Sequence, residues 1–443
     1  MQKQLKYPIL IINVVFLLVF IFFAPSLFAQ NDSSELKLNI QLRPRAEFRN
    51  GLFTPILESQ KPASFISQRS RLGVTYSKNQ KLQLGLSTQV VTTWGNDPQV
   101  QNTANDISLY EAWARINFNP SWSLKVGRQV LSYDDERILG KLDWNNAGRK
   151  HDAALLKFEK EKFRADAAFA FNQNSERSTG TFYNSSNSQP YKSMQLLWMK
   201  YSFSKTLSAS ALAMNLNFQN PADSGISNLQ TMGANLFYAK NKLHVNGTFY
   251  YQSGNMPLKN SSSIKTGAWM ASAKILFNVN NNAALGIGSD FLSGRDMNAT
   301  SSKITYFNPL YGTGHKFYGA MDYFYVASPH HNVGLWDSYL NLDLNASEKL
   351  SFQIALHHFT STAAVINYSG NKAAPTLGNE ADISFGYNIM KEVKLSGGYS
   401  QMFTDPSMRY VKNILPSQEM KSLQNWVWLS LNINPEILLY KSK

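Results

Sequence analysis

The sequence predicts a transmembrane β-barrel of about 18 antiparallel strands, a size within the range of outer-membrane barrels. Three observations predict this fold. Apolar and polar residues alternate along most of the chain, which is the period of a strand with two different faces. Short turns alternate with long polar loops, as in barrels that cross the outer membrane. Aromatic residues make up 13% of the 443 residues and charged residues only 16%, below the share typical of soluble domains.

The first 29 residues predict a secretory signal peptide. Lys3 and Lys6 precede an apolar run over residues 9–23, and the segment APSLFA ends at Ala29, after which we expect cleavage, with Ser26 as the alternative position. An uncleaved anchor helix is the alternative, because the apolar run is close to spanning length. Residues 30–443 are then expected to form one domain, since no linker or change of composition divides them.

Charge and cysteine content narrow the function. The formal net charge is +14, which favours an acidic partner. Export argues against nucleic acid, so we expect outer-membrane lipid, lipopolysaccharide and an anionic solute as the partners. The chain contains no cysteine, which excludes disulfides, thiolate metal sites and a thiol nucleophile.

The segment 36–49, LKLNIQLRPRAEFR, alternates almost without interruption. Its apolar face holds Leu36, Leu38, Ile40, Leu42, Ala46 and Phe48, and its polar face holds Lys37, Asn39, Gln41, Arg43, Arg45, Glu47 and Arg49. In a membrane barrel the polar face lines the lumen. The first strand therefore predicts a lumen with cations on its wall.

The same period continues through the rest of the chain. Further strands are expected over 66–77, 81–94, 107–118, 122–133, 151–159, 162–173, 192–203, 206–218, 229–240, 242–254, 265–278, 283–293, 332–345, 348–360, 379–389, 392–402 and 422–434. Arg128 falls on the apolar face of 122–133 unless Gly127 marks a bulge, which a glycine inside a strand often does.

Connection lengths provide independent support. Short turns are expected at 77–81, 119–122, 160–162, 204–206, 239–242, 345–349 and 390–393. Long loops are expected at 50–65, 95–106, 134–150, 174–191, 219–228, 255–264, 294–331, 361–378 and 403–421. This alternation predicts that the turns and both termini are periplasmic.

Charge is dense in the long loop and its flanks from Gly127 to Asp152, GRQVLSYDDERILGKLDWNNAGRKHD. The stretch resembles the alginate export family of outer-membrane porins in GRQ, DDERILG, the Trp144-Asn145 pair and GR-x-x-D. Other similar pieces follow the family's order along the chain: RPRAEFR at 43–49, QRSRLG at 68–73, EAWARI at 111–116, YGTGHKFYGAMDYF at 311–324 and GNEADISF at 378–385.

The resemblance implies a monomeric 18-stranded barrel whose basic, constricted pore passes an anionic polysaccharide. By position, the implied pore or mouth cations are Arg43, Arg45, Arg69, Arg71, Arg115, Arg128, Arg137 and Arg149. Their implied acidic partners are Glu111, Asp135 and Asp152, and Glu47 shares the lumenal face. The chain departs from the family at His151, where an aromatic residue is expected, and in the extra C-terminal EILLYKSK. A periplasmic export complex is a further partner that this resemblance leaves open.

The residue types fit this chemistry, and the alternatives stay open. The planar fork of arginine engages both oxygens of a carboxylate, and rows of cations in a narrow lumen concentrate anions. A small-anion or general porin is one alternative, and arginines that only neutralise neighbouring acids are another. An adhesin using the loop 294–331 without transport is a third.

An enzyme is not expected. The sequence has no GxSxG elbow, and the adjacent pairs His330-His331 and His357-His358 would point to opposite faces of a strand, which disfavours a metal site. Glu380 and Asp382 share a strand face, where a charge network is favoured over a glycosidase pair. We expect no catalytic residue, no metal and no cofactor. Aromatics at strand ends, including Trp94, Trp122, Trp426 and Trp428, predict interfacial girdles. Stacking of some of them on sugar rings inside the pore is the alternative, and the girdle is favoured.

Overall fold

The computed structural model describes residues 33–97, 99–100, 106–183, 191–220, 225–258, 261–300, 303–325, 328 and 330–442. The predicted signal peptide, residues 1–29, lies outside the described residues. Among those described, no helix is long and apolar enough to span a membrane.

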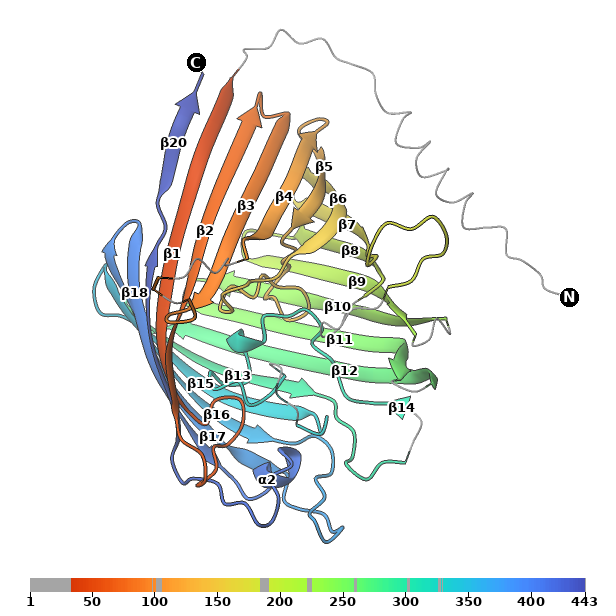
Figure 1. Cartoon of the computed structure of the whole chain (residues 1–443), viewed down its shortest axis with the longest axis vertical. Coiled ribbons are helices and arrows are strands. Elements are labelled where there is room, and N and C mark those ends of the chain that lie inside the picture. Colours follow the sequence, from red (N-terminus) through yellow and green to blue (C-terminus); the bar gives the residue numbers. More distant parts are fainter. Residues whose placement is uncertain are drawn as a thin grey trace, which may run out of the picture.

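Eighteen long antiparallel strands form a closed barrel, which confirms the predicted fold class (Figure 1). Each strand pairs with the next along the chain, and β19 returns to pair with β1. The barrel strands are β1 (Ser34–Asn50), β2 (Ala63–Lys78), β3 (Leu82–Thr93), β4 (Ser108–Asn117), β5 (Trp122–Gln129), β6 (His151–Lys160), β7 (Phe163–Phe171), β8 (Ser193–Ser202), β9 (Leu207–Gln219), β10 (Ile226–Lys240), β11 (Leu243–Leu258), β12 (Ser261–Asn278), β13 (Ala283–Leu292), β15 (Leu335–Asn345), β16 (Leu350–Thr360), β17 (Thr376–Met390), β18 (Val393–Thr404) and β19 (Gln424–Ile433).

Among the described residues, four short elements accompany these eighteen strands. They are β14 (Lys303–Ile304), the 3-10 turn η2 (Gly314–Lys316), helix α2 (Met408–Val411) and β20 (Glu436–Lys441). Strand β14 pairs with β12, and β20 pairs with the first half of β1. The extra C-terminal segment that the sequence singled out therefore continues the barrel wall beyond β19.

The two faces of the strands follow the predicted alternation. On β1, Arg43, Arg45 and Glu47 are buried on the lumenal side, whereas Leu42 and Phe48 are exposed on the outer side. Leucines such as Leu72 and Leu86 are about half exposed on the outer wall, as expected for side chains that meet lipid.

The two ends of the barrel differ as predicted. Short turns connect alternate strand pairs, and β1 starts and β20 ends at this same end (Figure 1). One expected long loop is wrong: most of 255–264 belongs to β11 and β12, which pair as far as Pro257↔Ser263 and Leu258↔Ser261. Strand pairing there continues through the polar residues, with a shift of register between Pro257 and Leu258.

Much of the buried apolar core lies inside the barrel rather than on its wall. Leu131, Ile138 and Leu139 from the β5–β6 loop and Phe307, Tyr311, Met321 and Phe324 from the β13–β15 loop belong to it. A parallel bridge between Leu139 and Tyr311 joins the two loops. Folded chain therefore occupies part of the lumen, and these two loops determine where any passage can run.

Candidate pore and its two vestibules

The β5–β6 loop, residues 130–150, crosses the lumen. Near its start, the Asp134 carboxylate accepts hydrogen bonds from Ser210 Oγ on β9 at 2.6 Å, Trp198 Nε1 on β8 at 3.0 Å and Asn235 Nδ2 on β10 at 3.1 Å. Burial raises the pKa of Asp134. Its backbone φ of 52° lies in the left-handed region that aspartate tolerates better than most residues, so the loop turns sharply toward this wall.

Arg137 fixes the middle of the loop to another wall. Its guanidinium donates two parallel hydrogen bonds to Asp290 on β13, at 2.9 and 2.8 Å, and a third from Nε to Asp135 at 2.7 Å. The Phe317 ring lies 4.0 Å from the guanidinium carbon. Arg137 and Asp290 are both buried, so this ion pair holds the loop against the wall.

The end of the loop binds the arginines of β1 and β2. The Asp143 carboxylate accepts hydrogen bonds from Arg69 Nη1 at 3.0 Å and Arg43 Nη1 at 3.3 Å. Arg43 also donates to Asn146 Oδ1 at 2.7 Å, and Arg45 donates to the Trp144 carbonyl at 2.8 Å. Burial alone would raise the pKa of Asp143, but the positive charges of Arg69 and Arg43 outweigh this effect and lower that pKa. We name this contact the Asp143 clamp.

The β13–β15 loop, residues 293–334, enters the lumen from the opposite wall. The backbone N–H of Met321 donates to Glu380 Oε1 on β17 at 2.8 Å, and Gln252 on β11 exchanges hydrogen bonds with the backbone of Asn308. Arg149 Nη1 donates to the Gly312 carbonyl at 2.8 Å. The two loops are therefore anchored to different walls and bonded to each other at mid-lumen.

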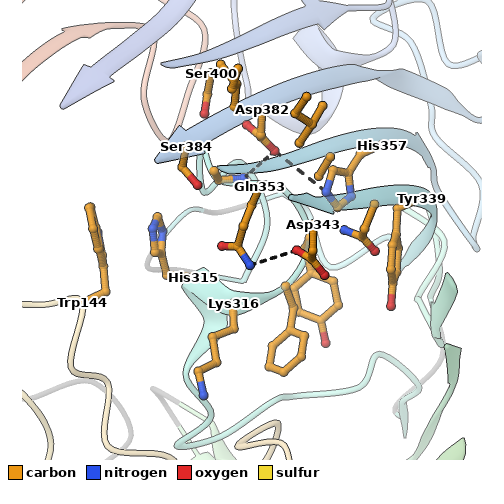
Figure 2. A pocket seen from close by; sticks show the side chains of 18 of the residues that line it. Trp144, His315, Lys316, Tyr339, Asp343, Gln353, His357, Asp382, Ser384 and Ser400 are labelled. Carbon is orange, nitrogen blue, oxygen red and sulfur yellow. Dashed lines mark hydrogen bonds and ion pairs between the residues drawn. The ribbon is translucent and has the colours of Figure 1, made fainter. Parts of the chain in front are cut away.

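The loops divide the lumen into two cavities. We call the cavity of about 1030 Å³ toward the long loops the outer vestibule, and the cavity of about 800 Å³ toward the short turns the inner vestibule. Of the described residues that line them, Trp144 and His315 line both. Their rings stack with centroids 4.3 Å apart and planes at 16°, and Figure 2 shows them side by side at one edge of the inner vestibule.

The vestibules differ in chemistry. Arg45, Arg49 and Arg149 line the outer one, together with aromatic rings and with Glu47 and Asp322. Strands such as β16, with Ser351, Gln353 and Ala355, contribute to the lining of the inner one. Its charges are mixed. Among the described residues, it is lined by the four cations Arg137, Lys274, Lys316 and Lys394 and by the five acids Asp135, Asp290, Asp337, Asp343 and Asp382. The outer vestibule, with three arginines and two acids, therefore has an excess of one positive charge, whereas the inner one has an excess of one negative charge.

Several predicted residues lie in the lumen but serve the loops or each other. Arg71 donates to Gln89 Oε1 at 2.7 Å and lies over the Tyr110 ring at 3.4 Å. Glu47 accepts hydrogen bonds from Arg45 and Arg49, each at 2.9 Å. This pairing is the charge neutralisation that the sequence left open as an alternative.

Two predicted residues on β4 behave differently from each other. Glu111 accepts a hydrogen bond from the backbone N–H of Val130 at 3.3 Å, so it supports the base of the β5–β6 loop. Arg115 lies on the lumenal face closer to the short turns, and its buried Nε has no hydrogen-bond partner among the described residues. Of the predicted cations described above, Arg115 is the one with the fewest of these contacts.

Arg128 and Asp152 lie on the outer face rather than in the lumen. They face each other across β5 and β6 and form a two-bond ion pair, with both contacts at 2.8 Å. Gly127 has a φ of 119°, but the pairing of β5 with both neighbours continues without a shift of register. Because no residue is inserted, Arg128 keeps the outward parity of Val126.

The sequence missed several residues that organise the lumen. Trp426 and Trp428 were expected in a girdle, but Trp426 is buried, donates to Glu47 Oε2 at 3.1 Å and packs edge-on against Trp144. The alternation of polar and apolar residues on 424–433 could have signalled this, because both tryptophans share parity with the polar residues Gln424, Ser430 and Asn432. Trp94 and Trp122 are exposed, as a girdle requires.

The histidines and acids form no metal cluster within the described part of the chain. His357 faces the lumen and bonds Asp337 at 2.9 Å, while His358 faces outward and bonds Asn379 at 2.8 Å. The prediction that this pair splits between two faces is confirmed. Glu380 and Asp382 do share a lumenal face, where Glu380 holds the β13–β15 loop.

A further buried cation ties the outer loops together. The Lys412 ammonium, just after α2, donates to the carbonyls of Phe53 and Tyr323 and to Ser328 Oγ. These acceptors come from the β1–β2 and β13–β15 loops. Burial lowers the pKa of Lys412 to about 7. We call this contact the Lys412 latch.

Comparison with known proteins agrees with this architecture. The family model described as alginate export matches residues 34–404. Among solved structures, the barrel is similar to OccAB4 of Acinetobacter baumannii, with a TM-score of 0.59 and 11% identity over 91% of this chain and 98% of that one. It is also similar to OpdK of Pseudomonas aeruginosa solved with vanillate, with a TM-score of 0.58 and 10% identity over 91% and 99%. OpdL of the same organism gives 0.56 and 15% over 92% and 99%. No curated protein matches the chain.

Proposed function

Because the chain belongs to the alginate export family, we propose that its channel passes carboxylate-bearing saccharides of the polyuronate type. Family and fold together support an outer-membrane channel rather than an enzyme. The finer proposal concerns what crosses it. We also propose that residues 1–29 are removed and that residues 30–443 form a single barrel domain. This barrel works as a monomer in contact with lipid and lipopolysaccharide, and its short turns are periplasmic.

One observation carries the proposal: the outer vestibule presents arginine and aromatic rings together. Arg49, whose side chain is 30% exposed, lies over the Phe65 ring at 4.5 Å, and Arg149 lies 5.8 Å from Tyr311. A uronate offers a carboxylate to the guanidinium and an apolar ring face to the aromatic side chains. The cavity volume is at the upper end of the range for ligand pockets.

A small-carboxylate channel is the second candidate. The two loops meet at mid-lumen and leave vestibules instead of an open tube, which favours permeants smaller than a polymer. OpdK, which shares the fold, was solved with vanillate, and vanillate carries a carboxylate. Both candidates use the same cations, so size distinguishes them.

The test is the reversal potential of the purified protein in a planar bilayer under a KCl gradient. We expect anion selectivity that falls markedly in the double variant Arg49→Gln, Arg149→Gln. Arg43 and Arg69 are unsuitable targets, because neutralising them also releases the Asp143 clamp. Arg164→Gln is the matched control, since Arg164 forms an exposed pair with Glu159 on the β6–β7 hairpin.

Two results decide the question. A cation-selective wild-type channel, or a double variant as anion-selective as the control, contradicts the proposal. Current block by a triuronate that exceeds block by a monocarboxylate of equal charge density supports the saccharide, and equal block favours the small-carboxylate channel.

A further inference from the structure

The boundary between the two vestibules is a pair of stacked rings. The loops are bonded to the barrel walls through many contacts, and the described linings of the two cavities share Trp144 and His315. A solute that moves from one vestibule to the other along these linings therefore meets the two rings. Their separation of 4.3 Å leaves no space between them, because aromatic faces at this distance are in van der Waals contact.

The backbone of Trp144 is fixed. Its carbonyl accepts hydrogen bonds from Arg45 Nη1 at 2.8 Å and Arg43 Nη2 at 3.4 Å. The Arg45 guanidinium lies 4.0 Å from the indole centroid, and Trp428 packs edge-on at 4.8 Å. The indole is therefore held as a rigid platform by groups other than His315.

His315 is held less firmly. It lies on η2, a single turn, and its side chain is 14% exposed. Its Nδ1 shares one hydrogen bond of 2.8 Å with Asp322, and its ring packs edge-on against Trp426 at 5.7 Å. The imidazole also covers the indole, so removing it would expose an aromatic face of the platform to the lumen. A ring with an apolar face can take the place of the imidazole against the indole.

Cations flank the stack on both sides. Arg45 lines the outer vestibule, and Lys316, the residue after His315, lines the inner one (Figure 2). Lys316 Nζ forms an ion pair with Glu136 at 2.8 Å, with its side chain 48% exposed. A carboxylate that moves from Arg45 in the outer vestibule into the inner vestibule therefore meets the ammonium of Lys316.

We propose that the Trp144 indole is the stacking platform of a saccharide subsite, which a uronate pyranose ring occupies by displacing the His315 imidazole. This inference rests on the proposed function and assigns the position where the sugar is bound during passage. The apolar C–H face of the ring replaces the imidazole against the indole, and its carboxylate reaches Arg45 or Lys316. Because one ring replaces another, binding is weak, as conduction requires of its sites.

The experiment measures triuronate block of single channels in planar bilayers, with the wild type and three variants. Trp144→Leu keeps an apolar side chain but removes the aromatic face, and we expect block to weaken roughly tenfold, on the scale of one aromatic stacking contact. Trp144→Phe keeps a ring and should retain most of the block. His315→Ala removes the competing ring, so block should strengthen and the open conductance should rise.

Trp122→Leu is the control, because Trp122 is exposed at the short-turn end, where it contacts Phe158. Unchanged block in Trp144→Leu overturns the proposal. Should that variant not assemble, His315→Ala decides the question, and a variant whose block and conductance equal those of the wild type overturns it.

A neutral trisaccharide separates this inference from the proposed function. Block by the neutral sugar that also depends on Trp144 supports the platform even where the channel shows no anion selectivity. Anion selectivity with triuronate block that is independent of Trp144 retains the proposed function and removes the platform.

Discussion

Replacing Asp143 by asparagine should loosen the β5–β6 loop from the β1–β2 wall and change how the channel conducts. The carboxylate accepts hydrogen bonds from Arg69 at 3.0 Å and Arg43 at 3.3 Å. An asparagine carbonyl can accept one such bond but carries no charge. Arg69, with a side chain only 1% exposed, would then keep its positive charge inside the protein without a carboxylate partner.

The size of the effect follows from burial. Removing one partner of a fully buried ion pair costs about 3–5 kcal/mol, but the Asp143 side chain is 44% exposed, and solvent weakens the pair. We therefore expect roughly 1–3 kcal/mol, the range of a hydrogen bond to a charged group. The loop keeps its anchors at Asp134 and Arg137, so this end of the loop should fluctuate while the barrel stays folded.

The assay is single-channel recording of Asp143→Asn beside Glu58→Gln, which changes an exposed acid in the β1–β2 loop. We expect larger open-channel noise and a higher mean conductance in Asp143→Asn. The lowered pKa of Asp143 adds a pH test with a definite sign. The clamp is complete above the ordinary carboxylate range and is lost as the pH falls through the lowered pKa, so acid should reproduce the variant in the wild type. Identical noise and conductance in the variant and the control at neutral pH would refute this reasoning.

Other perturbations should act at other anchors. Asp290→Asn leaves the buried Arg137 without its two-bond partner and should lower the free energy of unfolding by about 3–5 kcal/mol in urea titrations, whereas Asp343→Asn, which changes a vestibule wall residue, should have little effect. Lys412→Met should free the outer loops, seen as faster motion of a spin label on a cysteine introduced in 413–421 of this cysteine-free chain. Because the Lys412 pKa of about 7 is below its ordinary value of 10.5, the latch should gain stability as pH rises from about 7 toward 10, and this dependence should vanish in Lys412→Met. Arg128→Gln should leave reversal potential unchanged, and a shift comparable to that of the Arg49 and Arg149 variant would contradict its outward placement.

The strand pattern could be predicted because it is a local property. In a strand, neighbouring side chains point to opposite faces. The apolar Leu42 and the charged Arg43 therefore indicate the lipid-facing and lumenal sides of β1, and no distant residue is needed for this inference. Turn and loop lengths then give the order and direction of the strands. The exception is the segment 255–264, which the sequence predicts to be a loop because it is polar. Composition alone does not show where the pairing of two strands ends.

The placement of Arg128 shows the limit of a local rule. The glycine before it suggested a bulge that would turn the arginine inward. The structure adopts the positive φ at Gly127 without inserting a residue, so the parity holds. A glycine permits a bulge, and the pairing with the neighbouring strands decides whether one forms.

The sequence by itself determined the barrel, its two faces and the stretch where charge is concentrated. Only the tertiary structure decided that this stretch turns into the lumen, where Asp143 meets arginines 100 and 74 residues earlier in the chain. The same holds for the stack of Trp144 on His315, which come from two different loops. Periodicity encodes the face of a strand, but contacts between loops depend on chain closure over long separations, and no local pattern records them.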